Sequence, residues 1–130
     1  MVYGRGIGRS TSSGVVAPIA NLGLPIALRM ALVGWSRTLA REVGRDGITC
    51  NIVPPGRIAT QRIRFLDEAK AKREGHSVDS VAVDDTEAIA LGRYGKPKEY
   101  ADVVTSPASS LDSSITGSTI RICGCLIASV

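Results

Sequence analysis

The sequence predicts an α/β fold made of one domain over residues 1–130, with a parallel sheet covered by helices. Three observations support this prediction. A chain of 130 residues has the length of a single domain. Its residues are 44% hydrophobic but only 4% aromatic, so the core must be built from Ile, Leu, Val and Ala, as in a covered parallel sheet. A long amphipathic helix is followed directly by a short β-branched strand.

The N-terminal third predicts one irregular segment and one helix. Residues 1–14 are rich in Gly, Ser and Arg and contain no apolar run, so we expect little regular structure there. From Leu24 to Val43, apolar residues recur at steps of three or four, which places them on one stripe of a helix. That stripe consists of Leu28, Leu32, Trp35, Leu39 and Val43. Gly44 and Gly47 then supply the end of the helix.

A strand and a second helix follow. Residues 48–53 form a short β-branched run, and Pro54-Pro55-Gly56 ends it because proline donates no hydrogen bond to a sheet. Thr60 is a suitable N-cap for a helix that runs to about Glu74, with Gly75 after it. Most side chains of this helix are charged, so we expect a mobile element on the surface.

The last third predicts two short helices and an edge strand. Ser77 caps a helix that extends toward Asp85. Pro97 lies where the first turn of another helix accepts proline, and Pro107 should end that helix early. Residues 118–123 alternate in polarity, which indicates a strand at the edge of the sheet.

Charge and apolar pattern argue against nucleic-acid and membrane partners. The net charge of +4 comes from basic residues spread along the chain, without a basic stripe or an aromatic platform for bases. The uncharged stretch 14–28 is interrupted by Pro18, Asn21 and Pro25 and lacks a cleavage site, so it predicts neither a secretion signal nor a membrane span. We therefore expect a cytoplasmic protein.

The cysteines predict free thiols and no metal centre. Cys50, Cys123 and Cys125 are an odd number, and with the single His76 they do not give the paired spacing of a zinc site. Free thiols in a reducing cytosol are the expected state. Binding of a soft metal or oxidation at Cys123-Gly124-Cys125 is the alternative.

Three segments, in this order, resemble the second half of short-chain dehydrogenases/reductases, in particular 3-oxoacyl-ACP-reductase-like members. Ser12-Ser13-Gly14 with residues 29–42 is similar to the family's catalytic serine region and active-site helix. Asn51 to Thr60 resembles the N-x-V-x-P-G-x-I-x-T loop. Residues 92–102 and 115–120 look like the C-terminal helix and last strand. The similarity covers nearly the whole chain.

This resemblance implies a fold and a cofactor. The chain is then the C-terminal part of a doubly wound, Rossmann-like parallel sheet whose N-terminal strands are missing. In the family the Pro-Gly loop covers the nicotinamide of NAD or NADP, which makes Pro55, Gly56, Ile58 and Thr60 the cofactor-binding candidates. A glycine after a strand end also gives a flat ring room to approach. The implied substrate is a small carbonyl compound or alcohol.

The catalytic residues depart from the family pattern. Hydride transfer to a carbonyl needs a proton donor, and the family uses a tyrosine with a lysine four residues later and a serine. Aligned without gaps, the tyrosine position holds Pro25 and the lysine position holds Arg29, while Ser12 is at the serine position with Ser13 beside it. Ser12, Ser13 and Arg29 remain the catalytic candidates. Arg29 is able to hold a carboxylate or phosphate, but a solvated helix residue is the simpler interpretation.

Two further departures affect structure. The strand that should present the serine looks shortened, with only Ser10 and Thr11 between Arg9 and Ser12. The family's Asp-Gly-Gly is replaced by Cys123-Gly124-Cys125. Residues 4–9 imitate a Gly-rich dinucleotide fingerprint, but no strand precedes them, so we do not interpret them as a phosphate site.

Two functions follow from these residues. The first is an oxidoreductase of this family that is inactive as this chain, because the phosphate-binding half and the proton-donating tyrosine are absent. The alternative is an interaction fragment in which the apolar face of the 24–43 helix pairs with a second copy or with an intact family member. A truncated reading frame accounts for both.

Overall fold

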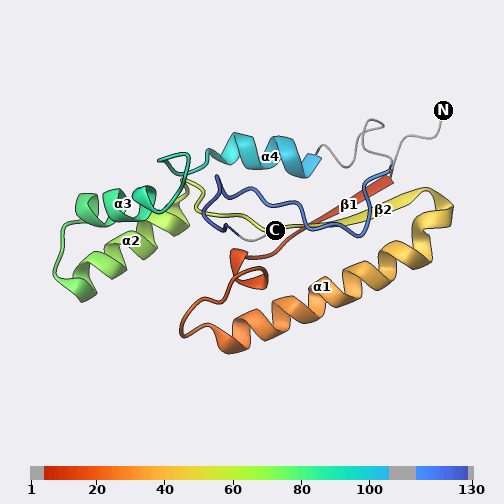
Figure 1. The fold of residues 1–130 in the computed structure, drawn as a ribbon, viewed down its shortest axis with the longest axis horizontal. Coiled ribbons are helices and arrows are strands. Elements are labelled where there is room, and N and C mark those ends of the chain that lie inside the picture. Colours follow the sequence, from red (N-terminus) through yellow and green to blue (C-terminus); the bar gives the residue numbers. More distant parts are fainter. Residues whose placement is uncertain (1–4, 106–113, 129–130) are drawn as a thin grey trace.

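The computed structural model describes residues 5–105 and 114–128 (Figure 1). Helix α1 lies on one side of the two strands and α4 on the other, while α2 and α3 form a pair at one end of the molecule. The elements, in chain order, are β1 (Arg5–Ser10), η1 (Ser13–Val15), α1 (Gly23–Val43), η2 (Gly44–Asp46), β2 (Ile48–Val53), α2 (Gln61–Glu74), α3 (Val78–Glu87) and α4 (Pro97–Thr105). The α/β prediction is confirmed as a small two-stranded parallel sheet with helices.

Strand β2 lies at the centre of the molecule. It pairs in parallel with β1, from Arg5 opposite Ile48 to Ser10 opposite Val53. On its other side it bonds to residues 118–122: the Ile52 N–H donates to the Ser118 carbonyl at 2.9 Å, and the Ile120 N–H donates to the Ile52 carbonyl at 2.8 Å. The predicted last strand therefore lies at the expected edge, but it forms isolated bridges rather than a continuous strand.

Asn51 fixes the C-terminal segment against β2. Its side chain is completely buried. The amide nitrogen donates to the Ile115 carbonyl at 2.8 Å, and its oxygen accepts the Ser118 N–H at 3.1 Å. A buried amide requires such partners, because an unpaired one costs about 1–3 kcal/mol. Asn51 thus joins two segments that are far apart in the sequence.

The expectation of little structure before residue 14 is wrong. Residues 5–10 form β1, so the strand that leads to Ser12 is present rather than shortened. Pairing with the buried β2 supplies the stability that a Gly-rich sequence lacks on its own. Gly8 also suits the close packing of α4, since a Cβ at that position would lie 3.3 Å from the Val104 carbonyl oxygen.

Helix α1 packs on the sheet through small side chains. Val33, Ser36 and Ala40 are its buried residues, and the Ser36 Oγ lies 3.5 Å from the buried Cys50 Sγ. The apolar stripe predicted from the sequence lies only partly against the sheet: Leu32, Leu39 and Val43 are half-buried, whereas Leu28 is 67% exposed. Trp35 is 48% exposed, and the Arg9 guanidinium lies 4.5 Å from the centre of its ring. The helix therefore has a sheet-facing side of small residues, and its first turns expose large apolar residues.

The predicted helix ends are confirmed. Gly47 and Gly75 adopt positive φ at the ends of η2 and α2, and the Thr60 and Ser77 hydroxyls accept backbone N–H groups at the starts of α2 and α3. Helix α3 extends two residues beyond Asp85, to Glu87. Helix α4 begins at Pro97 as predicted, while the expected stop at Pro107 lies outside the described residues.

The helices of the described segments are too short or too polar to cross a bilayer.

A strained turn near the C-terminus yields a stability prediction. The Leu126 N–H donates to the Cys123 carbonyl at 3.0 Å, and the two intervening residues, Gly124 and Cys125, have φ of 57° and 62°. Positive φ costs a side-chain-bearing residue about 1–2 kcal/mol. We expect Cys125→Gly to raise the free energy of unfolding by about 1 kcal/mol in urea titrations. Cys125→Ala, which removes the thiol but keeps a Cβ, is the control and should leave the midpoint unchanged; equal gains from both variants would contradict the strain.

Candidate functional site

The candidate site residues gather at the carboxyl edge of the sheet. Because β1 and β2 run in parallel and end opposite each other at Ser10 and Val53, the segments that follow them leave from one edge. Gly14 brings the first turns of α1 to this edge, since a Cβ on it would lie 2.9 Å from the Ile26 side chain. Figure 1 shows the short turn after β1 beside the start of α1. This edge is where doubly wound folds bind ligands.

Ser12 and Ser13 lie directly after β1 and are half-buried. The Ser12 Oγ accepts the Gly14 N–H at 3.2 Å and so caps η1. The Ser13 carbonyl accepts the N–H groups of Val16 and Ala17 at 2.9 and 3.1 Å. Both serines therefore have structural roles in the turn, Ser12 through its hydroxyl and Ser13 through its backbone carbonyl.

Arg29 and Pro25 are both exposed on the first turns of α1. The Arg29 Nη1 donates to the Pro25 carbonyl at 3.2 Å, so the guanidinium folds back along its own helix. Proline has no proton to give, and arginine stays charged at working pH. These two positions consequently supply no acid for carbonyl reduction.

The phenol at this edge that sequence reasoning missed is Tyr100. Its hydroxyl lies 2.7 Å from the Ser10 Oγ and 2.9 Å from the Val53 carbonyl oxygen. One hydroxyl hydrogen serves only one acceptor, so the Ser10 hydroxyl donates to Tyr100 and Tyr100 donates to Val53. Tyr100 thereby holds α4 across the ends of both strands. The local sequence of α4 does not indicate this contact, because its partners lie 90 and 47 residues away in the sequence.

Gly56 packs against the C-terminal turn. Its N–H donates to the Ile122 carbonyl at 2.8 Å, and a Cβ at this position would lie 2.6 Å from the Cys123 Cα. We expected the missing side chain to make room for a flat ring. In the structure the space beside that side of Gly56 is filled by the chain's own backbone, so a close approach of two segments is what requires glycine here.

The other cofactor candidates are also held by internal contacts. Pro55 forms an isolated bridge with Ile122, and Ile58 forms one with Gly95 and is 9% exposed. The Gly95 N–H donates to the Arg57 carbonyl and the Ala59 N–H donates to the Gly95 carbonyl, both at 2.8 Å. The Thr60 Oγ1 caps α2. Residues 54–60 (the Pro-Gly loop) thus have a fixed backbone.

A cluster of paired charges joins this loop to α2 and α3. The Arg57 Nη1 donates to Asp67 Oδ1 at 2.9 Å, and its Nη2 forms an ion pair with Asp85 Oδ2 at 2.8 Å. The Lys70 Nζ pairs with Asp85 Oδ1 at 3.0 Å, and the Tyr94 hydroxyl donates to Asp67 Oδ2 at 2.9 Å. The carboxylate side chains are only 5% and 12% exposed. We call these five residues the Arg57 cluster.

The Arg57 cluster also changes the acidity of its phenol. Burial, with the hydrogen bond to Asp67, raises the pKa of Tyr94 to about 12 against the opposing charge of Arg57. A phenol that holds its proton so firmly is a poor acid catalyst near neutral pH. Tyr94 therefore does not replace the proton donor that Pro25 displaces. The sequence predicts a mobile surface element for this helix; most of α2 is exposed, but Asp67 and Ala71 are buried.

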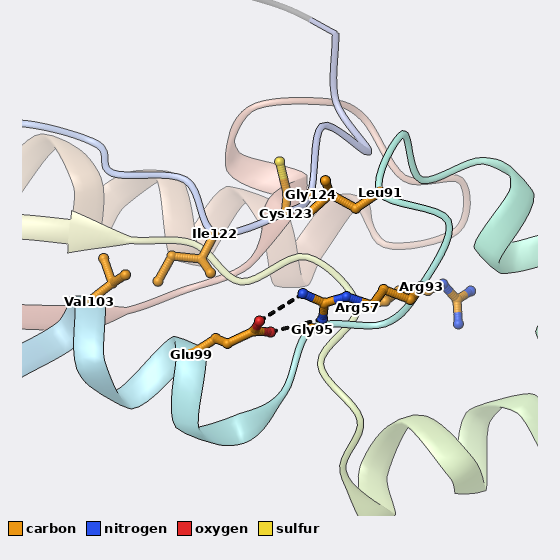
Figure 2. Close-up of a pocket in the computed structure, with 9 residues that line it drawn as sticks. All are labelled: Arg57, Leu91, Arg93, Gly95, Glu99, Val103, Ile122, Cys123 and Gly124. Atoms are coloured by element: carbon orange, nitrogen blue, oxygen red, sulfur yellow. Dashed lines mark hydrogen bonds and ion pairs between the residues drawn. The ribbon is translucent and has the colours of Figure 1, made fainter.

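The cavity in Figure 2 lies beside the Pro-Gly loop. It has a volume of about 180 Å³ and is lined by Arg57, Leu91, Arg93, Gly95, Glu99, Val103, Ile122, Cys123 and Gly124. Arg93 donates two hydrogen bonds to Glu99, at 3.0 and 2.7 Å, and the Lys96 N–H donates a third at 2.7 Å. The hydrogen bonds from Arg93 lower the pKa of Glu99 to about 2. The cavity is smaller than the roughly 300–1,000 Å³ of typical small-molecule pockets.

Neither a dinucleotide cradle nor a metal centre is found in residues 5–105 and 114–128. The Gly-rich residues 5–9 lie inside β1 instead of forming a turn that opens a helix, which is what a phosphate site needs. No three His, Cys, Asp or Glu side chains of these segments are grouped to hold an ion. The residues present therefore do not by themselves fit a nicotinamide dinucleotide.

Comparisons with known proteins agree with the fold. A family model described as "Enoyl-(Acyl carrier protein) reductase" matches residues 4–125. The (3R)-3-hydroxyacyl-CoA dehydrogenase of Homo sapiens is 35% identical over 114 residues, which cover 86% of this chain and 40% of that protein. The short-chain reductase protein NovJ of Streptomyces niveus is 35% identical over 122 residues, covering 92% and 45%.

Solved structures give the same result. A short chain dehydrogenase family protein from Francisella tularensis subsp. tularensis SCHU S4 matches with a TM-score of 0.88 and 26% identity, over 98% of this chain and 52% of that one. YwfH, an NADPH dependent reductase involved in bacilysin biosynthesis, matches with a TM-score of 0.88 and 26% identity, over 95% and 47%. The chain spans about half the length of the proteins it matches.

The close contact at Gly56 is testable. We expect Gly56→Ala to lower the free energy of unfolding by about 1–3 kcal/mol, because the added methyl group meets the Cys123 backbone. Gly34→Ala is the matched control: no atom lies within 4 Å of its Cβ position on α1, so it should stabilise by up to about 1 kcal/mol. Urea unfolding of both variants measures the difference. A Gly56→Ala protein as stable as the wild type would show that this contact does not exist.

Proposed function

The chain belongs to the short-chain dehydrogenase/reductase family of oxidoreductases, and from that premise we propose that it is an NAD(P)-type carbonyl reductase or alcohol dehydrogenase by descent that does not turn over a substrate alone. The residues at 12, 13, 25 and 29 carry this proposal. Two serines remain at the strand edge, but the phenol and the amine that should face them are replaced by Pro25 and Arg29.

The chemistry that is lost is the protonation of an alkoxide. When bound, the nicotinamide cofactor supplies a hydride, and the protein must supply the proton and hold the oxygen. Ser12 and Ser13 are the groups at this edge that would hydrogen-bond that oxygen. Arg29 carries a positive charge but no transferable proton. The proposed substrate class is a small carbonyl compound or the corresponding alcohol.

The proposed cofactor contacts are Pro55, Gly56, Ile58 and Thr60. The similarity to YwfH, described as NADPH dependent, supports NAD or NADP as the cofactor of the family member. The rigid backbone of these residues suits a surface that covers a ring. Dinucleotide binding by the chain alone is opposed by the lack of a phosphate cradle in the described residues. The free thiols of Cys50, Cys123 and Cys125 fit a cytoplasmic location.

A nucleotide titration tests the inactive state. We expect no saturable change in Trp35 emission when NADPH or NADH is added to the purified chain in the micromolar range, and no consumption of NADPH with a 3-oxoacyl substrate. A variant with Pro25→Tyr and Arg29→Lys restores the phenol and the amine. It should stay inactive, because the cradle is still missing. Saturable micromolar binding, or turnover by this variant, would contradict the proposal.

The second candidate function is association through α1. The outward side of this helix exposes large apolar residues: Leu24 is 74% exposed, Leu28 is 67% exposed and Trp35 is 48% exposed. An uncovered apolar helix face of this kind is typical of an interface. A second copy of the chain, or an intact family member that presents the same helix, is the partner proposed here.

Size-exclusion chromatography with light scattering tests this association. We expect the wild-type chain to be a dimer or larger and Leu28→Glu to shift it toward the monomer, because a buried carboxylate opposes the interface. Phe65→Glu is the control, since Phe65 is 60% exposed on α2, away from that face. A well-folded wild-type monomer at all concentrations would exclude the α1 interface.

A further inference from the structure

We propose that Arg57 is a positioning residue that makes the α2–α3 pair and the Pro-Gly loop move as one unit. This inference rests on the proposed function for its meaning, because the Pro-Gly loop is the proposed cofactor surface. Its evidence is the geometry of the Arg57 cluster, which is independent of any nucleotide.

Arg57 contacts three separate elements. Its backbone belongs to the Pro-Gly loop, its Nη1 donates to Asp67 on α2, and its Nη2 pairs with Asp85 on α3. A guanidinium is planar and presents donors in two directions, so one side chain is able to join two carboxylates. Lys70 has a single ammonium and spans only from α2 to α3. Arg57 is therefore the side chain of the cluster that ties both helices to the loop.

Burial makes these contacts strong. The side chains of Asp67 and Asp85 are 5% and 12% exposed, and that of Arg57 is 27% exposed. Removing one partner of a buried ion pair is strongly destabilising, because the other charge is left without compensation. By contrast, Arg64 and Glu68 on the same helix are 81% and 51% exposed, and such surface pairs contribute little.

The loop is able to transmit this restraint. The Arg57 carbonyl accepts the Gly95 N–H, and the Gly95 carbonyl accepts the Ala59 N–H. Tyr94, the residue before Gly95, donates to Asp67, and its ring lies 5.9 Å from the Arg57 guanidinium carbon. Side chain and backbone contacts of Arg57 thus meet in the segment 94–95. Figure 1 shows the α2–α3 pair at the end of the molecule, where few other elements hold it.

A linkage between two surfaces follows. A ligand that changes the position of α2 or α3 would alter the backbone at residues 57–59, and a ligand seated on the Pro-Gly loop would restrain α2 and α3. Thermodynamic linkage makes the effect reciprocal.

Native-state hydrogen exchange of the purified chain, without nucleotide, tests the proposal. The variant is Arg57→Met, and the probes are the Ala59 and Gly95 amides in the loop and the Val81 amide in α3. We expect exchange at both places to accelerate by the same factor, roughly tenfold or more, because both are released together. The amides of β2 report global unfolding, and in the wild type and the variant they should exchange more slowly than the loop and α3 probes, which should match each other. The control Arg64→Met should alter none of these rates.

Further variants separate the outcomes. Arg57→Lys keeps the positive charge but not the planar guanidinium with its two donor directions. We therefore expect the loop and α3 amides of this variant to exchange faster than in the wild type. Exchange at the wild-type rate would overturn the role of the guanidinium. If Arg57→Met fails to fold, the triple variant Arg57→Met, Asp67→Asn and Asp85→Asn removes the uncompensated charges and is measured instead. Faster exchange in α3 with an unchanged loop, or loop and α3 probes that exchange no faster than β2 in the wild type, overturns the proposal. Saturable NADPH binding would contradict only the proposed function, because the exchange measurement uses no nucleotide.

Discussion

The rest of the structure depends on the burial of β2. Its residues from Thr49 to Val53 are all buried, and hydrogen bonds leave it on both edges, to β1 on one side and to residues 118–122 on the other. Because both faces and both edges of this strand are covered, each element that contacts it must fit its side chains or its backbone groups. The small residues of α1 fit one face, Gly8 admits α4 near the other, and Asn51 selects the C-terminal partner. The candidate site lies where this strand ends.

Elements with local signals were predictable from the sequence. The β-branched run of β2, the capping hydroxyls of Thr60 and Ser77 and the terminal Gly47 and Gly75 act within a few residues, and the structure confirms them. Strand β1 was missed because its stability comes from pairing with β2, which local propensity does not report. The final strand was located correctly, but its hydrogen bonds are too irregular to form a continuous ladder.

The edge of the sheet at which the candidate residues lie was predictable, and their roles stay predictions. Motif order placed Ser12, Ser13 and the Pro-Gly loop at one edge, and the parallel pairing of β1 with β2 agrees with this. The Arg57 cluster was not foreseen, because helix 61–74 is so rich in charge that a single buried carboxylate in it has no distinct pattern. The role of Gly56 also differed, since its neighbour Cys123 is distant in sequence. Contacts over long sequence separations account for both differences.

Pro25 has a consequence for how α1 begins. It is the third residue of α1, in the first turn, where a helix has no use for a backbone N–H, and its carbonyl accepts the Arg29 guanidinium. The N-cap residue, Leu22, makes no side-chain capping bond. The fixed φ of Pro25 therefore helps to start the helix. A tyrosine at this position would lack that fixed φ and favour the helix start less. The side chain that gives this position no proton donor is therefore also the one that stabilises the first turn of α1.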